Sequence, residues 1–272
     1  MSSSGLALET HLTAIGVPIL VRTHGSGAAE LAASVREAWR DCLSDRSPAE
    51  PLVVDAMLDD DCAAVDRAAA RGMVANTSLE VVLDRLSPRI TGEAITRNAG
   101  KLLMLHACGL ADPDTGAAVA LVARSGTGKT TVSRTLGLKW GYLTDETVAI
   151  RPDGVVLPYP KPLSILANTG DLIKHQVAAS SLGLVAAPTT SRLVGIAVLD
   201  RDEDGPDCEM VDVPTVLALA ELAPQTSFLR RLPRPLHHVA GILDSVGGLR
   251  RVRYREAALL QDVVADLVGS RR

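Results

Sequence analysis

Aromatic side chains are scarce in this chain of 272 residues and make up only 2% of it. Positive charge is not in excess either, because the formal net charge at pH 7 is −4. A nucleic-acid-binding surface needs clustered basic residues, and single-strand binding also needs rings on which bases stack. The composition therefore argues against nucleic acid as a partner. It also leaves aliphatic contacts, or a few rings such as Tyr142 and Tyr159, to hold an adenine base.

Cysteine pairs with metal-binding or redox spacing are also missing. The four cysteines, Cys42, Cys62, Cys108 and Cys208, are scattered and form no C-x-x-C pair. This usage is typical of reduced thiols rather than of a disulfide framework or a zinc site. The chain has no basic-then-apolar leader and no apolar run long enough to cross a bilayer. We therefore expect a cytoplasmic protein with no membrane partner.

The remaining composition is that of a globular protein, with 47% hydrophobic and 22% charged residues. This length accommodates one large or two modest domains. We expect a small N-terminal α/β domain over residues 1–100 and a nucleotide-binding domain over residues 101–272. Hydrophobic spacing predicts alternating elements in the first region: strands over 17–21 and 52–56, and helices over 28–39, over 63–73 and from Ser87-Pro88 to Asn98.

Two clusters of charge have competing explanations. The three aspartates at residues 59–61 either hold a metal ion or form a solvated turn that starts a helix, and the spacing favours the helix start. Arg251, Arg253 and Arg255 alternate along a predicted strand at 249–255. They either face an anionic partner or protect a solvated edge strand from pairing, and we favour the edge strand.

The central motif of the sequence is a phosphate-binding loop. An apolar strand around residues 117–122 leads into a glycine-containing loop, and a predicted helix over 129–139 follows. In such a loop, backbone N–H groups and the helix N-terminus surround an anion, and a lysine adds a full charge. The usual pattern has glycine at the position of Ala123. The residues expected to bind nucleotide are Ser125, Gly126, Thr127, Gly128, Lys129, Thr130 and Thr131.

Chemistry-bearing residues frame this loop on both sides. A predicted strand ends at His106, and a hairpin turn at residues 112–116 joins it to the strand of the loop. After the loop helix, a short strand ends in Asp145 and Glu146. Because neighbouring residues of a strand point to opposite faces, two different roles are expected for these acids. His106 is either structural or close to the phosphates. The bland alternative for the whole motif is a glycine turn with an exposed lysine.

A proline-rich segment, Pro158-Tyr159-Pro160-Lys161-Pro162, follows the acidic pair. Three prolines restrict the backbone to an extended conformation, so Tyr159 and Lys161 would lose little entropy on meeting a ligand. The segment is either a linker or one wall of the nucleotide pocket. In the second case Lys161 would contact the phosphates.

The stretches LLMLHACGLA, VARSGTGKTT, GYLTDETVAI and YPKPLSI together resemble the HPr serine kinase/phosphorylase family, over roughly residues 102–165. The resemblance implies a phosphoenolpyruvate carboxykinase-type P-loop fold, an α/β core whose mixed sheet is flanked by helices. It implies that His106 lies near the reacting phosphates, that Lys129 and Thr130 hold ATP and magnesium, that Asp145 accepts the hydroxyl proton, and that Glu146 assists the metal. Where the family has a second aspartate, this chain has Glu146, and we find no copy of the family's later glycine-rich signature.

These features predict an ATP- and magnesium-dependent kinase that phosphorylates a serine-type hydroxyl of a small molecule, peptide or protein. A second hypothesis is a nucleotide-binding regulatory or assembly module that hydrolyses ATP slowly or not at all. A carboxykinase-like decarboxylase is a weaker third hypothesis, because no lysine–histidine metal set is readable. A homo-oligomer is compatible with each of them.

Overall fold

The computed structural model describes residues 7–45, 50–123, 128–166 and 172–269. The chain forms two compact units that both mix helices and strands, so the α/β class is confirmed. The first unit contains residues 1–97 and 161–181, and the second contains residues 98–160 and 182–272. The predicted domain boundary at residue 100 stays a prediction. No helix in the described ranges is long and apolar enough to cross a bilayer.

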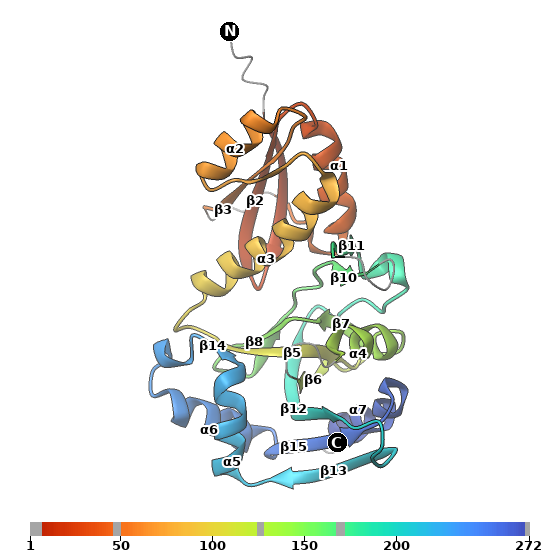
Figure 1. Cartoon of the computed structure of the whole chain (residues 1–272). Coiled ribbons are helices and arrows are strands. Elements are labelled where there is room, and N and C mark those ends of the chain that lie inside the picture. Colours follow the sequence, from red (N-terminus) through yellow and green to blue (C-terminus); the bar gives the residue numbers. More distant parts are fainter. Residues whose placement is uncertain (1–6, 46–49, 124–127, 167–171, 270–272) are drawn as a thin grey trace. The chain divides into compact units, whose positions relative to one another are not determined.

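The first unit, which carries the labels α1, α2, α3, β2 and β3 in Figure 1, is built on a four-stranded sheet in the order β1-β2-β3-β4. The β1–β2 pair is a tight antiparallel hairpin, and β2, β3 and β4 run parallel. The strands are β1 (Leu8–Ala14), β2 (Val17–His24), β3 (Leu52–Leu58) and β4 (Val74–Asn76). A separate two-stranded sheet pairs β10 (Leu163–Ile165) with β11 (His175–Val177).

Three helices connect and cover this sheet: α1 (Ala28–Ala38), α2 (Cys62–Ala70) and α3 (Leu79–Arg97). Alternate residues of β2, such as Ile19 and Val21, are fully buried, as the two-residue period of a strand requires for a covered face. On the other face, α2 packs Val65 and Ala68 against Ala75. Asp61 is the N-cap of α2 and accepts a bond from the Ala63 N–H, which confirms the predicted helix start.

One predicted helix boundary in this unit is wrong. Ser87-Pro88 was expected to begin a helix, but α3 begins at Leu79 and Pro88 lies inside it. The cap signal comes earlier, where the Ser78 side chain accepts a bond from the Val81 N–H at 3.5 Å. Proline at position 88 lacks only its own N–H, and the buried Leu86 and Ile90 on either side anchor the helix against the unit's core.

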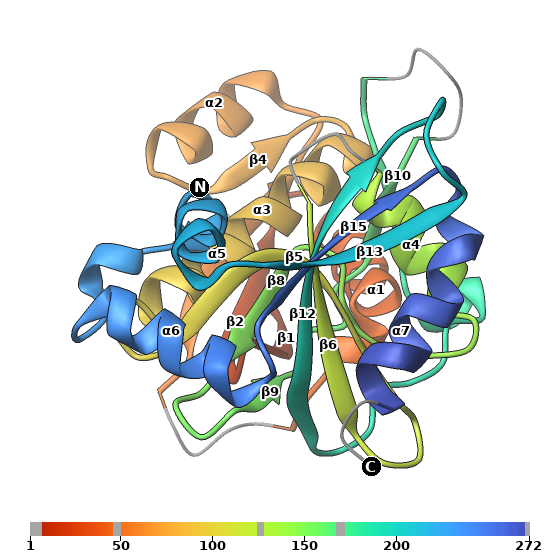
Figure 2. The ribbon, with the colours of Figure 1, turned by 90° about the horizontal axis from the view of Figure 1, so that it is seen from below.

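The second unit has a nine-stranded mixed sheet. Seven strands follow in the order β13-β15-β12-β6-β5-β8-β9 and are labelled in Figure 2. The other two, β7 and β14, pair with β5. β12 is parallel to both β6 and β15, and the other pairings are antiparallel. The strands are β5 (Leu103–Ala111), β6 (Ala117–Val122), β7 (Gly141–Thr144), β8 (Thr147–Ile150), β9 (Val155–Leu157), β12 (Ser191–Arg201), β13 (Cys208–Val213), β14 (Thr226–Ser227) and β15 (Leu249–Tyr254).

Two hydrophobic cores lie on opposite faces of this sheet, and β6 contributes to both in strict alternation. Ala118, Ala120 and Val122 join the core covered by α5 (Thr215–Leu222) and α6 (Pro235–Ser245). Val119 and Leu121 join the core covered by α4 (Lys129–Leu136) and α7 (Leu260–Gly269). β6 is thereby buried on both faces, and the loop that follows it leaves a rigid support.

The predicted edge strand at residues 249–255 is an interior strand, because β15 pairs with both β12 and β13. Its arginines therefore do not protect an exposed sheet edge, and they do not form a free surface for an anionic partner. Instead they pair with carboxylates, mainly from β13 and the turn before it: Arg250 with Asp212, Arg251 with Glu221, Arg253 with Asp202 and Glu209, and Arg255 with Asp207. Sequence reasoning missed β13, a short strand in which five of the six residues are exposed and Glu209 and Asp212 interrupt the apolar residues.

Candidate functional site

The phosphate-loop strand and helix are both present in the second unit, with β6 before the loop and α4 after it. Ser125, Gly126 and Thr127 lie outside the described residues. Gly128 immediately precedes α4 and has φ of +88°, a left-handed conformation that a side chain would strain. The helix that was predicted to begin at Lys129, directly after this glycine, is therefore present.

Lys129 is the first residue of α4 and is buried, with 9% of its surface exposed. Its Nζ donates a hydrogen bond of 2.7 Å to the carbonyl of Ala123, the last described residue before the loop. Burial lowers the pKa of Lys129, and the carboxylates of Asp145 and Glu146 act in the opposite direction. The exposed lysine of the bland alternative is not what the structure contains.

Asp145 is buried, and two hydroxyl groups converge on its carboxylate. Thr130 donates from α4 to Oδ2 at 3.2 Å, and Tyr142 donates from β7 to Oδ1 at 3.1 Å. Thr130 follows the phosphate-loop lysine, and Asp145 follows the end of β7. A hydroxyl expected at the phosphates and a carboxylate expected at the reacting hydroxyl are thus adjacent.

His106 lies inside β5, which continues to Ala111, so the predicted strand end at His106 is wrong. Its register partner is Thr147 of β8, next to the acidic pair. Burial lowers the pKa of His106 and the positive charge of Lys129 lowers it further, while Glu146 and Asp145 oppose both. The half-buried imidazole therefore shares its electrostatic environment with the lysine and the two acids.

Glu146 does not lie on a strand, because β7 ends at Thr144 and β8 begins at Thr147. The two acids occupy the bend between these strands. The Thr144 hydroxyl accepts bonds from the N–H groups of Glu146 and Thr147, at 3.2 and 3.3 Å, and the Glu146 carbonyl accepts from Ala107 N–H at 3.2 Å. The bend is therefore held by local bonds and by β5.

The donor chemistry at this place fits magnesium. Mg²⁺ prefers oxygen ligands and is bound through one or two carboxylates together with substrate phosphates and water. The hydroxyl of Thr130 and the carboxylate of Asp145 are 3.2 Å apart, and Glu146 follows directly in sequence. Among the described residues no cluster of three His, Cys, Asp or Glu could hold a metal by itself. Phosphate oxygens would have to complete the coordination shell.

Two further residues that were predicted to bind nucleotide, Thr131 and Lys161, lie in different parts of the structure. Thr131 is exposed on α4. Lys161 belongs to the first unit, is buried, and donates from Nζ to the carbonyl of Pro162 at 3.1 Å. Burial raises the pKa of the Cys42 thiol in the same unit, and the charge of Lys161 acts in the opposite direction. A contact of Lys161 with phosphates stays a prediction.

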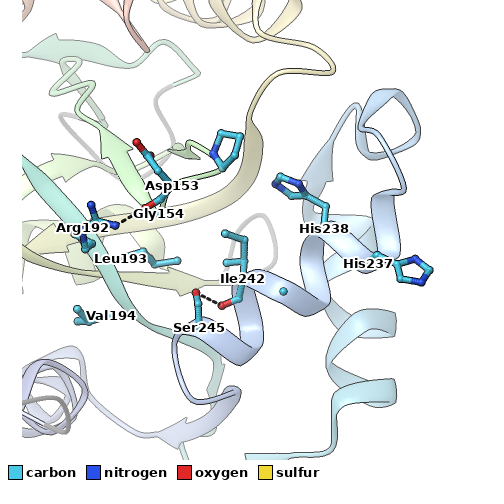
Figure 3. A pocket seen from close by; sticks show the side chains of 11 residues that line it. Asp153, Gly154, Arg192, Leu193, Val194, His237, His238, Ile242 and Ser245 are labelled. Atoms are coloured by element: carbon cyan, nitrogen blue, oxygen red, sulfur yellow. Dashed lines mark hydrogen bonds between the residues drawn. The ribbon is translucent and has the colours of Figure 1, made fainter.

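A cleft of about 700 Å³ in the second unit lies between the β8–β9 turn, the start of β12 and α6 (Figure 3). Arg192 donates to the carbonyl of Asp153 there, and His238 turns its ring towards Asp153 while His237 points away. Arg192 pairs with Ala117 at the start of β6, whereas the phosphate loop follows the end of that strand. Arg192 therefore lies at the opposite end of β6 from the loop, and its position does not support a role as a phosphate clamp.

Sequence reasoning missed two supports of the site. Tyr142 was considered for base stacking, but its ring is buried and its hydroxyl binds Asp145. Ser133 of α4 donates to the Cys108 sulfur of β5 at 3.1 Å, which ties the loop helix to the strand that carries His106. The four-residue step from Lys129 to Ser133 was the available signal, because it places both side chains on one helix face.

Comparisons with known proteins give little further guidance. No protein-family model matches the chain, and no curated protein is similar to it. Among solved structures, the HPr(Ser) kinase/phosphatase from Coxiella burnetii aligns with 61% of this chain and 94% of its own, at 10% identity and a TM-score of 0.30. This likeness is distant, and a TM-score of 0.30 carries no weight for either fold family or activity.

Proposed function

We propose that this protein is an ATP- and magnesium-dependent phosphotransferase that transfers the γ-phosphate to a hydroxyl group. The observation that carries the proposal is the hydrogen bond between Thr130 and Asp145, which joins the start of the phosphate-loop helix to the acidic bend. Phosphoryl transfer depends on positioning and charge neutralisation, and a buried carboxylate beside a phosphate loop serves both. The resemblance of the motif order to HPr serine kinases supports the same reaction class and a carboxykinase-type P-loop core.

The residues divide into binding and proton-transfer roles. Lys129 and the N-terminal amides of α4 would bind the β- and γ-phosphates, which requires Lys129 to exchange the Ala123 carbonyl for phosphate oxygens. Thr130 and Glu146 would hold magnesium, which supplies charge neutralisation to the phosphates when bound. Asp145 would accept the proton of the attacking hydroxyl, and His106 would donate a hydrogen bond to the transferred group.

The proposal is tested with γ-labelled ATP, magnesium, and serine, threonine or a short serine-containing peptide as acceptor. Lys129→Ala should abolish nucleotide binding, because it removes the buried ammonium group at the start of α4. Asp145→Asn should retain nucleotide binding but lower the transfer rate roughly 100-fold or more, since it removes the proton acceptor. Binding by calorimetry and the fate of the label are measured separately.

Two matched variants control for the loss of charge. Lys139→Ala removes an exposed lysine beyond the end of α4, and Asp244→Asn removes an exposed carboxylate of α6. Neither should change binding or transfer. Equal transfer by Asp145→Asn and the unaltered protein would refute the assigned base. If ATP binds tightly but the labelled phosphate is transferred neither to an acceptor nor to water, the protein is instead a nucleotide-binding module.

A further inference from the structure

A second concentration of charge lies in the first unit, far along the sequence from the phosphate loop. A pocket of about 510 Å³ is formed by β2, β3, α2 and the residues that follow α2. We call it the arginine pocket, because Arg22, Arg67 and Arg71 line it together with His24 and Asp55. None of these residues belongs to the proposed phosphotransfer site.

Strand register explains how β2 and β3 supply one side of the arginine pocket. Arg22 pairs with Asp55, and His24 pairs with Met57, in the parallel register of these strands. Paired residues of neighbouring strands point to the same face, and residues two apart on one strand do as well. The opposite face carries the buried side chains of the same strands. The polar residues are therefore confined to the face on which α2 lies.

The helix supplies the other side of the pocket. Arg67 lies in the last turn of α2 and Arg71 is the C-cap residue that follows the helix, and both line the pocket. Basic residues at a helix C-terminus also stabilise the helix dipole, which would be a sufficient reason for these two alone. It does not account for Arg22 and His24, which line the same pocket from β2.

Charges in the arginine pocket are not balanced. Asp55 accepts from Arg22 Nε and Nη2, each at 3.0 Å, and from His24 Nε2 at 2.8 Å. Burial raises the pKa of Asp55, but its bonds to Arg22 and His24 outweigh burial and lower the pKa overall. The Asp55 carboxylate is therefore already bound by Arg22 and His24. It leaves Arg67 and Arg71 without a carboxylate inside the pocket.

Arg67 and Arg71, at the end of α2, are therefore available to bind a ligand. Within the described ranges, the ion pair of Arg67 is a long one of 3.7 Å with the exposed Asp61, a geometry that contributes little to stability. Arg71 is exposed, and none of the described residues offers it an ion-pair partner. The apolar part of the lining comes from Met57, Met73 and alanines of α2. Guanidinium groups prefer planar or tetrahedral oxyanions, which they bind through paired N–H donors.

We infer that the arginine pocket binds a small organic anion, whose phosphate or carboxylate group is held by Arg67 and Arg71 and whose apolar part lies against Met57 and Met73. Arg22 and His24, held in place by Asp55, complete the polar rim. The inference is independent of the proposed phosphotransferase activity, because it uses no residue of that site.

The test uses NMR signals of the histidine rings in the full-length protein, with glycerol 3-phosphate, inorganic phosphate and succinate as separate probes. The signal of His24 is assigned by its loss in His24→Gln. Each bound probe should move this signal with saturation at millimolar concentration. The signal of His106 reports phosphate at the proposed phosphotransfer site, so the two sites are read separately. Phosphate esters and dicarboxylates are distinguished by which probe saturates first.

Arg71→Gln should weaken the saturating response of His24 roughly tenfold, because it removes one charge-assisted interaction. The matched control is Arg36→Gln, which removes an exposed arginine from the last turn of α1 and should leave the response unchanged. Circular dichroism confirms that both variants are folded. A His24 signal that no probe moves, or equal affinities of Arg71→Gln and Arg36→Gln, would overturn the inference.

Discussion

Asp145 is the residue on which the α4 and β7 hydroxyls meet. Thr130 and Tyr142 donate to different oxygens of its carboxylate, so each oxygen has a defined role before any ligand arrives. The hydroxyl of Thr130 would exchange this bond for a metal ion. Tyr142 is buried and would keep its bond throughout. Tyr142 is therefore a positioning residue for the proposed proton acceptor.

Replacing Tyr142 by phenylalanine tests this role. Tyr142→Phe keeps the ring but removes the hydrogen bond to a charged acceptor, so we expect a loss of about 1–3 kcal/mol in the free energy of unfolding. Transfer should slow while the dissociation constant for ATP stays unchanged. Tyr254→Phe is the control, because that ring is also buried but no bond of its hydroxyl is found among the described residues. Urea unfolding and single-turnover rates are the measurements; equal effects of both variants would contradict the role.

His106 should make the folded protein sensitive to mild acid. Its pKa in the folded state lies below the ordinary value of 6.5, mainly through burial. As the pH falls below that value the unfolded chain takes up the proton first, so stability decreases towards the lower folded pKa and is unaffected above the ordinary value.

Urea unfolding between about pH 8 and pH 6 measures this effect. The free energy of unfolding should fall less over this range in His106→Gln than in the unaltered protein. The other five of the six histidines are common to both proteins and cancel in the difference. If the free energies of unfolding of the two proteins depended on pH in the same way, the pKa of His106 would not be lowered in the folded state.

Among the elements of the second unit, the N-terminal end of α4 is fixed in place by several local contacts. β6 is buried on both faces, Gly128 turns the chain in a left-handed conformation, and Lys129 reaches back to the strand end. Ser133 then ties the helix to β5. The helix is eight residues long, so these local constraints rather than its own propensity hold its orientation.

Two glycine-to-alanine substitutions separate backbone strain from lost space. Among the described residues, nothing lies within 4 Å of an added Cβ at either Gly128 or Gly92, but only Gly128 of these two has a positive φ. Gly128→Ala should cost about 1–2 kcal/mol of stability through strain and should weaken nucleotide binding. Gly92→Ala, inside α3, should raise stability by about 0.5–1 kcal/mol without affecting binding. Thermal unfolding and ATP titration of both variants check these signs, and a stabilising Gly128→Ala would contradict the assigned backbone conformation.

For the whole molecule, the two compact units each have their own sheet and core. The chain contains two tryptophans, and each unit has one, Trp39 in the first and Trp140 in the second. Trp39 is fully buried, and Trp140 donates to Gln261 at 3.0 Å. Fluorescence of single-tryptophan variants therefore reports on one unit at a time.

Ligands should stabilise the units separately. MgATP at about 100 times its dissociation constant should stabilise the unit that binds it by about 2.7 kcal/mol. We expect the urea midpoint of Trp140, in Trp39→Phe, to rise by more than the midpoint of Trp39 in Trp140→Phe. Succinate should have the reverse preference. Coincident transitions that shift equally with either ligand would show that the two units unfold as one.

Particular residues show how far the sequence could lead. The glycine–lysine–threonine motif, its strand and helix, and the Asp112–Gly116 hairpin turn depend on neighbours in the chain, and such local patterns are readable from sequence. The edge-strand prediction for residues 249–255 was wrong because the strand that covers this edge, β13, is short and Glu209 and Asp212 interrupt its apolar residues. Pro88 misplaced a helix start because a mid-helix proline and an N1 proline look alike without the tertiary context.

By itself, the sequence determined the α/β class, the phosphate-loop motif and the order of histidine, loop and acidic pair. These follow from local spacing and from residue types that few other structures require. Only the tertiary structure decided that Tyr142 supports Asp145, that Arg192 lies at the other end of the loop strand, and that Arg22, Arg67 and Arg71 share a pocket. Those relations depend on strand register and helix packing between distant segments, which a single chain of letters does not encode locally.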